Sequence, residues 1–120
     1  ELNFCNAGHN APFIISGDGK ISYINVQPNL PLGLMGEFPY VGQDMMIEKS
    51  TKLYLYTDGV NEAENKENKQ LGDAKLVSLL RANASNEPGE IVEKIFEEII
   101  RHADGATQSD DITMMCIKFR

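Results

Sequence analysis

The fold of this chain is decided by an apolar run that ends on an acidic turn, Tyr54-Leu55-Tyr56-Thr57-Asp58-Gly59-Val60. A second acidic turn, Ser109-Asp110-Asp111-Ile112-Thr113, adjoins another strand-like run near the C-terminus. At the end of a strand a short carboxylate is held rigidly and still faces water. Fixed carboxylates that meet in space bind hard divalent cations, because Mg²⁺ and Mn²⁺ prefer oxygen ligands. The two turns therefore predict metal-assisted chemistry.

The composition predicts a single acidic domain. The chain has 120 residues with 42% hydrophobic content, enough for one core and too short for two. Its 18 acidic and 11 basic residues give a formal charge of -7, which disfavours nucleic acids and anionic membranes as partners. No apolar run approaches the roughly 18 to 20 residues of a membrane span, and no secretory signal opens the chain. We expect a soluble domain.

Two cysteines, Cys5 and Cys116, lie in strand-like segments without Cys-x-x-Cys spacing. This placement favours buried free thiols over a disulfide or a zinc site. The cysteines thus indicate a reducing compartment.

The first third of the chain has the pattern of an antiparallel meander. Two strand-like runs, residues 2–7 and 11–16, flank the turn residues Gly8-His9-Asn10, which predicts a hairpin. A second turn, Ser16-Gly17-Asp18-Gly19, leads into a third run at residues 20–26. The chain breakers that follow predict a long ordered loop.

That loop covers residues 27–41, which contain three prolines and two glycines. Long loops beside a metal site are often functional. Two further short strands are predicted at residues 45–48 and 53–57, and a final strand at 112–119.

Two amphipathic helices are predicted between the acidic turns. The first starts at Gly72-Asp73, places leucines and a valine on one face, and ends near residue 84. The second starts at Pro88 and carries an apolar stripe that we expect to face the core: Ile91, Val92, Ile95, Phe96, Ile99 and Ile100. His102, in its last turn, is expected to act as a cation at the helix C-terminus, not as a ligand. Strands and helices in this order predict an α+β fold.

Five motifs in order carry a family resemblance. They are Asn6-Ala7-Gly8-His9-Asn10, Pro31-Leu32-Gly33-Leu34, residues 55–63, Leu71-Gly72 and residues 109–113. Together they resemble the metal-dependent protein phosphatases of the PPM (protein phosphatase 2C) family, and more narrowly its bacterial SpoIIE/RsbU branch. The resemblance implies part of a β-sandwich flanked by helices, with both helices on the outer face of one sheet.

The resemblance also implies roles for individual residues. Asp58 and Asp110 would ligate one ion of a two-metal Mn²⁺ or Mg²⁺ centre. Asp111 would either support these ligands without contacting the metal or act as a ligand on the substrate side. Gly59 matches the small residue after the ligand, where a side chain would crowd the metal's waters. His9 belongs to the branch signature, and we expect it to stabilise its turn. Phosphoester hydrolysis would proceed without a phosphoenzyme.

One departure from the family concerns an upstream Asp-Gly motif, whose aspartate bridges both metals. Nothing before Asn6 supplies it, and Gly17-Asp18-Gly19 is expected to be a plain turn. We therefore expect residues 1–120 to be the C-terminal half of a longer phosphatase domain. Alone, this part should be inactive, bind metal weakly or not at all, and be able to self-associate through uncovered sheet edges or apolar patches.

The implied substrate is a regulatory protein of the anti-anti-sigma (STAS-like) type that carries phosphoserine or phosphothreonine. A sensor domain upstream in the same polypeptide is also implied, as is a cytoplasmic position, even where other segments anchor the full-length protein to a membrane. Two alternatives stand beside this hypothesis. One is an inactive phosphatase-like domain that binds the phosphoprotein or another partner. The other is a haloacid dehalogenase-like enzyme, which is disfavoured because Tyr56 occupies the position of its nucleophilic aspartate.

Overall fold

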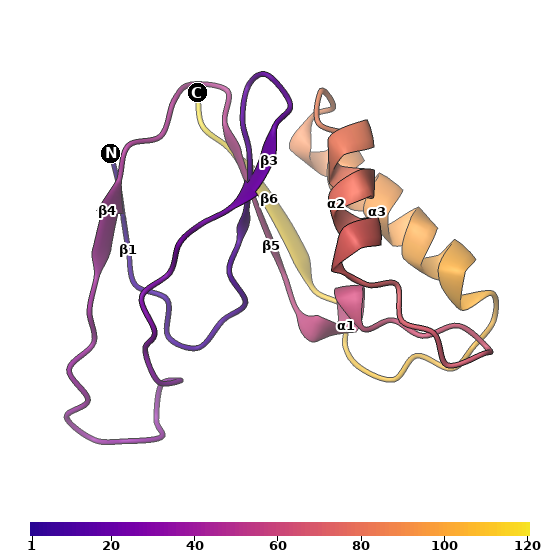
Figure 1. Cartoon of the computed structure of the whole chain (residues 1–120), viewed down its shortest axis with the longest axis horizontal. Helices are drawn as coiled ribbons and strands as arrows, with labels where there is room; N and C mark the ends of the chain where they lie inside the picture. The colour runs from indigo at the N-terminus through magenta and orange to yellow at the C-terminus, as the bar shows by residue number, and fades with distance from the viewer.

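The computed structural model describes residues 1–120 as six strands and three helices (Figure 1). The strands are β1 (Leu2–Phe4), β2 (Phe13–Ile15), β3 (Ile21–Tyr23), β4 (Gln43–Met45), β5 (Lys52–Tyr56) and β6 (Met114–Lys118). The helices are α1 (Asp58–Asn61), α2 (Asp73–Ala82) and α3 (Pro88–Ala103). These elements confirm the predicted α+β class.

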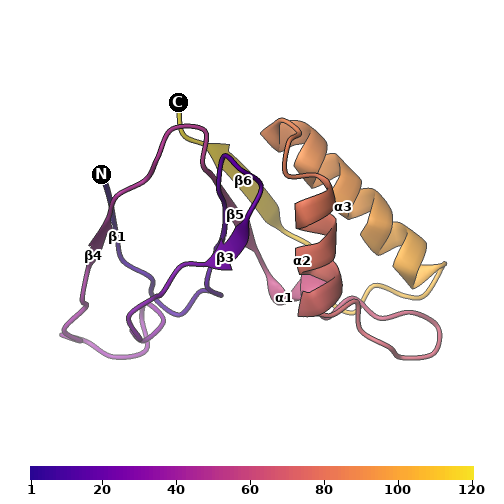
Figure 2. The same ribbon diagram turned by 45° about the horizontal axis from the view of Figure 1, so that its top comes forward.

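The strands form two antiparallel sheets. A four-stranded sheet has the order β3-β2-β5-β6, and β1 pairs with β4 in a second, two-stranded sheet. Helices α2 and α3 lie together on one side of the larger sheet, and the small sheet lies on the other side (Figures 1 and 2). An apolar hollow of about 230 Å³ lies between the two sheets, with walls that include Phe4, Leu55 and Ile117. This layering matches the predicted sandwich flanked by helices.

The first predicted hairpin is wrong. β1 pairs with β4, with Leu2 opposite Met45, and makes no ladder with β2. The turn at residues 8–10 does not fold the chain back on itself but leads it from the small sheet into β2 of the larger sheet, with Gly8 in a left-handed conformation (φ +86°). The strand predicted at residues 45–48 is accordingly shifted to residues 43–45, where β1 supplies its partner.

The second predicted hairpin is confirmed. β2 and β3 pair directly, and the Ser16 N–H donates to the Lys20 carbonyl at 3.0 Å across the turn. Asp18 accepts a hydrogen bond from the Lys20 N–H at 3.2 Å, so Gly17-Asp18-Gly19 is a local turn.

The predicted long loop contains no helix or strand between β3 and β4. Asn29 orders it: its side-chain amide donates to the Asn6 carbonyl at 3.0 Å and to the Val41 carbonyl at 3.1 Å. The Asn29 side-chain oxygen in turn accepts from the Val41 N–H at 2.9 Å. The two ends of the loop are thus tied to each other and to the turn that precedes β2.

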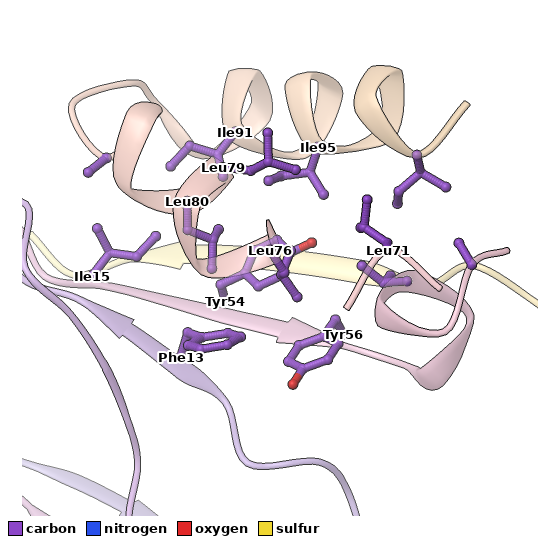
Figure 3. Packing of buried hydrophobic residues seen from close by; sticks show 14 residues of the cluster. Phe13, Ile15, Tyr54, Tyr56, Leu71, Leu76, Leu79, Leu80, Ile91 and Ile95 are labelled. Atoms are coloured by element: carbon purple, nitrogen blue, oxygen red, sulfur yellow. The ribbon is translucent and has the colours of Figure 1, made fainter. Parts of the chain in front are cut away.

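The core lies between the four-stranded sheet and helices α2 and α3 (Figure 3). Residues of this core that are less than 2% exposed come from β2, β5 and both helices: Phe13, Ile15, Tyr54, Leu76, Leu80, Ile91, Ile95 and Ile99, with Val60 from α1. Each such side chain contributes about 1.5–3 kcal/mol through burial. The core therefore fixes β5, the strand that leads into the first acidic turn.

The predicted stripe of α3 is only half buried. Ile91, Ile95 and Ile99 contact the core, whereas Phe96 is 46% and Ile100 53% exposed. A single i, i+4 row of α3 faces the sheet and α2, and the neighbouring row faces outward. The longest helix, α3, has 16 residues, and no helix of the chain has both the length and the apolar character needed to cross a membrane.

Two smaller predictions concern the thiols and His102. Both cysteines are free, but Cys5, which directly follows β1, is exposed, against expectation. Cys116 is half-buried in β6. His102 lies in the last turn of α3 as predicted, where its Nε2–H donates to the Lys69 carbonyl at 2.8 Å.

Candidate metal centre

The two acidic turns meet where β5 ends and β6 begins. These strands are antiparallel neighbours, with Tyr56 opposite Met114, so the exit of one lies beside the entrance of the other. The Thr57 N–H donates to the Thr113 carbonyl at 3.1 Å and continues the ladder by one residue. The fold therefore brings together segments that are more than 50 positions apart in the sequence.

The Thr57 side chain joins the two turns. Its hydroxyl donates to the Asp111 carbonyl at 3.2 Å and accepts from the Thr113 N–H at 3.1 Å. One hydroxyl thus satisfies backbone groups on both sides of Ile112. No role for Thr57 was predicted from the sequence, although it stands immediately before Asp58 in the motif.

Gly59 is buried where the two turns press against each other. A Cβ at position 59 would lie 2.1 Å from the Asp111 carbonyl oxygen and 2.7 Å from its carbon. The structure thus gives a packing reason for glycine, different from the expected need to leave space for the metal's waters. The backbone of the second acidic turn occupies the place of a side chain at residue 59.

Asp58 is exposed at the first position of the short helix α1. Its carboxylate Oδ1 accepts a hydrogen bond from the Asn10 side-chain amide at 2.8 Å. The turn at residues 8–10, predicted to close a hairpin, instead delivers Asn10 to the first acidic turn. Sequence reasoning missed Asn10, and the available signal was its place in the motif Asn6–Asn10.

Asp110 and Asp111 lie in the loop before β6, and both are exposed. The Asp111 N–H donates to Asp110 Oδ1 at 2.7 Å, and the Gln108 side-chain amide donates to the Asp110 carbonyl at 2.8 Å. These bonds order the loop around Asp110. The loop also borders a cavity of about 110 Å³ that Gly59, Asp110 and the C-terminal end of α3 line.

His9 lies in the turn that carries Asn10. Its N–H donates to Asn6 Oδ1 at 2.8 Å, and its Nδ1–H donates to the Asn10 carbonyl at 2.8 Å. Both contacts stabilise the turn itself. The exposed ring also borders a shallow hollow beside Thr57 and Thr113.

Tyr56 precedes the first acidic turn, and its ring is buried and stacks on Phe13 (Figure 3). Burial, aided by the charge of Asp73 and by Tyr23 and Asp58, raises the pKa of its hydroxyl to about 12. A buried phenol cannot replace the nucleophilic aspartate of a haloacid dehalogenase-like enzyme. This geometry argues against that alternative.

The donor chemistry fits hard divalent cations. Asp58 and Asp110 offer carboxylate oxygens on adjoining, exposed turns, which is the ligand type that Mg²⁺ and Mn²⁺ prefer. Each of these ions takes about six ligands, more than two carboxylates supply. No three His, Cys, Asp or Glu side chains of the chain form a group that could hold a metal ion. Asp58 and Asp110 therefore match part of a coordination sphere.

Comparison with known families identifies the chain. The family profile described as stage II sporulation protein E (SpoIIE) matches residues 1–120, the whole chain. The chain belongs to the SpoIIE family. This membership confirms the resemblance to the SpoIIE/RsbU branch of the PPM phosphatases.

Curated relatives align over nearly the whole chain. Protein IcfG from Synechocystis sp. is 34% identical over 117 residues, which cover 98% of this chain and 18% of IcfG. Phosphoserine phosphatase RsbU from Bacillus subtilis is 25% identical over 118 residues, covering 98% of this chain and 35% of RsbU. This SpoIIE-family chain therefore spans well under half of the curated relatives that it matches.

A solved structure confirms the fold. The phosphatase domain of the cell fate determinant SpoIIE from Bacillus subtilis, described as Mn presoaked, matches with a TM-score of 0.70 and 20% identity. The match covers 98% of this chain and 50% of that domain chain. The α+β fold of residues 1–120 thus corresponds to about half of a SpoIIE-type phosphatase domain.

Proposed function

We propose that residues 1–120 are part of a Mn²⁺- or Mg²⁺-dependent phosphatase that hydrolyses phosphoserine or phosphothreonine on a regulatory protein. The observation that carries this proposal is the close approach of the two acidic turns, with Gly59 against the Asp111 carbonyl. That packing has its simplest explanation in a need to bring Asp58 and Asp110 to one edge of the sheet. The similarity to RsbU, named a phosphoserine phosphatase, supports the reaction class.

In this proposal some residues of the chain bind the metal ions and others position the turns that carry the ligands. Asp58 and Asp110 would hold the divalent cations through carboxylate oxygens, and Thr57 keeps their turns in register through its two hydrogen bonds. When bound, the ions neutralise charge on the phosphoryl oxygens and activate the attacking water. Further oxygen ligands would come from outside residues 1–120, since the chain covers 50% of the SpoIIE phosphatase domain that it matches.

The partner that suits this domain is a phosphorylated protein of the anti-anti-sigma (STAS-like) type, met in the cytoplasm, with an upstream sensor domain controlling turnover. The formal charge of -7 disfavours an anionic surface as the docking partner, so the phosphate is recognised chiefly through the metal centre. A binding module without turnover is the second candidate, and the experiment below separates the two.

The test is Mn²⁺-dependent hydrolysis of p-nitrophenyl phosphate by the natural full-length protein. Asp58→Asn removes a charged oxygen ligand, which should cost several kcal/mol of transition-state stabilisation, about 100-fold or more in rate. Asp104→Asn is the matched control. It makes the same chemical change at an exposed left-handed position (φ 46°), where asparagine is equally acceptable.

Activity that survives Asp58→Asn would remove Asp58 from the centre. A folded parent without any turnover at saturating Mn²⁺ would favour the binding module. Activity that is lost in Asp58→Asn and kept in Asp104→Asn supports the phosphatase.

A further inference from the structure

The turn that carries Asn10 is a rigid unit built by its own hydrogen bonds. Asn6 accepts from the His9 N–H at 2.8 Å, and the His9 ring donates to the Asn10 carbonyl at the same distance. Two bonds within residues 6–10 are more than a short exposed loop needs to connect two strands. Asn10 therefore projects from a framework that is already ordered.

The long loop at residues 27–41 packs against this turn and forms a hydrogen bond to it. The Asn29 amide donates to the Asn6 carbonyl at 3.0 Å, and Pro31 packs against Gly8 so closely that a Cβ there would lie 2.6 Å from the proline ring. Gly8 also has a φ of +86°, which favours glycine. A side chain at residue 8 would push the turn away from Pro31 and displace the residues that follow it.

One side-chain hydrogen bond connects this framework to the candidate metal ligands. The Asn10 amide donates to Asp58 Oδ1 at 2.8 Å, across 48 positions of sequence. The hydrogen bond engages one carboxylate oxygen, restricts rotation of the carboxylate and leaves Oδ2 free to face a cation. Partners of this kind, which orient a ligating carboxylate, typically change metal affinity by about 10- to 100-fold.

We propose that Asn10 is a positioning residue, which orients the Asp58 carboxylate for a divalent cation and links the ordered turn at residues 6–10 to the metal centre. This inference rests on the proposed function, since it takes Asp58 as a metal ligand. It assigns the turn at residues 8–10 a role that its place in a predicted hairpin did not suggest. In this role Asn10 acts through its hydrogen bond to Asp58 and is not itself a ligand.

If Asn10 served only to hold the turn in place, its loss would have a different effect from the loss of a positioning residue. A tether lost from an exposed edge would lower the stability of the metal-free protein and leave Mn²⁺ affinity unchanged once the protein is folded. A lost positioning bond lets the Asp58 carboxylate rotate, so each binding event must reorder it, and affinity falls while the metal-free protein stays folded.

The test measures Mn²⁺ binding to the natural full-length protein by isothermal titration calorimetry, together with the melting temperature with and without Mn²⁺. Asn10→Ala should weaken binding about 10-fold or more and shrink the Mn²⁺-induced rise in melting temperature. Asn10→Gln, which keeps an amide donor on a longer side chain, should recover part of the affinity. Asn86→Ala is the matched control, because Asn86 donates only to Asn83 in the turn between α2 and α3.

The outcomes separate this inference from the proposed function. Failure of Asp58→Asn to weaken Mn²⁺ binding would overturn the metal site, and the positioning role with it. Weak binding by Asp58→Asn beside unchanged binding by Asn10→Ala would overturn the positioning role alone. If Asn10→Ala does not fold, Asn10→Ser replaces it, because serine suits a turn and its hydroxyl is too short to reach Asp58. The same loss of affinity is then expected, and unchanged affinity refutes the proposal.

Discussion

Gly59→Ala is the change that most directly tests how the two acidic turns are joined. The added Cβ would lie 2.1 Å from the Asp111 carbonyl oxygen. Real Cβ atoms essentially never lie closer than 3.0 Å to a non-bonded heavy atom, so this contact cannot be tolerated. The obstacle is backbone, so it cannot rotate away as a flexible side chain would. Either α1 or the loop before β6 must move by about 1 Å.

The cost of that movement follows from the contacts around it. Overpacking of a buried position costs about 1–3 kcal/mol. The shift also strains the two hydrogen bonds of the Thr57 hydroxyl, each worth about 1 kcal/mol. We therefore expect Gly59→Ala to lower the free energy of unfolding by about 2–4 kcal/mol. Because a misplacement of about 1 Å costs about 100-fold in rate, activity should fall by a similar factor.

Urea unfolding followed by circular dichroism, and p-nitrophenyl phosphate hydrolysis at saturating Mn²⁺, measure the two effects in the natural full-length protein. Gly36→Ala is the matched control, because nothing lies within 4 Å of a Cβ at residue 36 and its φ is not positive. The control should be neutral or slightly stabilising, by up to about 1 kcal/mol. The reasoning is refuted if Gly59→Ala unfolds at the same urea concentration as Gly36→Ala and keeps full activity.

Two further predictions concern the core and the buried tyrosine. Ile95→Ala should destabilise the protein by about 2–5 kcal/mol in urea unfolding because Ile95 is fully buried, whereas the exposed Phe96→Ala should cost far less, and equal costs would contradict the one-row packing of α3. The raised pKa of Tyr56, about 12, means that the folded state disfavours its ionised form. This contribution to stability is complete below pH 10, near the ordinary pKa of tyrosine, and is lost as pH rises through 12. Tyr56→Phe should flatten the decline in melting temperature over that alkaline range, and an unchanged decline would show that Tyr56 does not cause it.

The parts of the fold that the sequence predicted well depend on local patterns. Helices α2 and α3 begin at Asp73 and Pro88, as their start signals and helical periodicity indicated. The β2–β3 hairpin likewise depends on a turn of adjacent residues. Such features are encoded within one or two turns of chain, so a single sequence is enough to find them.

The parts that the sequence missed depend on contacts between distant segments. β1 pairs with a strand some 40 positions away, and the turn residues at positions 8–10 carry no information about this pairing. The hydrogen bond from Asn10 to Asp58 spans 48 positions, and periodicity carries no information about it. The burial of the exposed row of α3 was wrongly predicted for a related reason. An apolar pattern shows how wide the apolar stripe of a helix is, but it does not show how much of that stripe other elements cover.

The candidate site was predicted as two acidic turns, and the structure adds how they are joined. The meeting of the strand ends follows from the β5–β6 ladder, which residue types alone do not specify. Thr57 and Gly59 could have been identified as neighbours of Asp58 within one motif. Their tasks became visible only when the backbone of Asp111 was in place beside them.

The division of tasks within Thr57-Asp58-Gly59 has a consequence for the natural history of such domains. The Thr57 hydroxyl and the missing side chain of Gly59 hold the turns together, whereas the hydrogen bond of the Asp58 carboxylate goes to Asn10, outside both turns. Selection for a folded protein alone would thus retain the threonine and the glycine in a lineage that had abandoned catalysis. The same selection would leave position 58 free to drift, so among related genes the aspartate is the informative marker of a working enzyme.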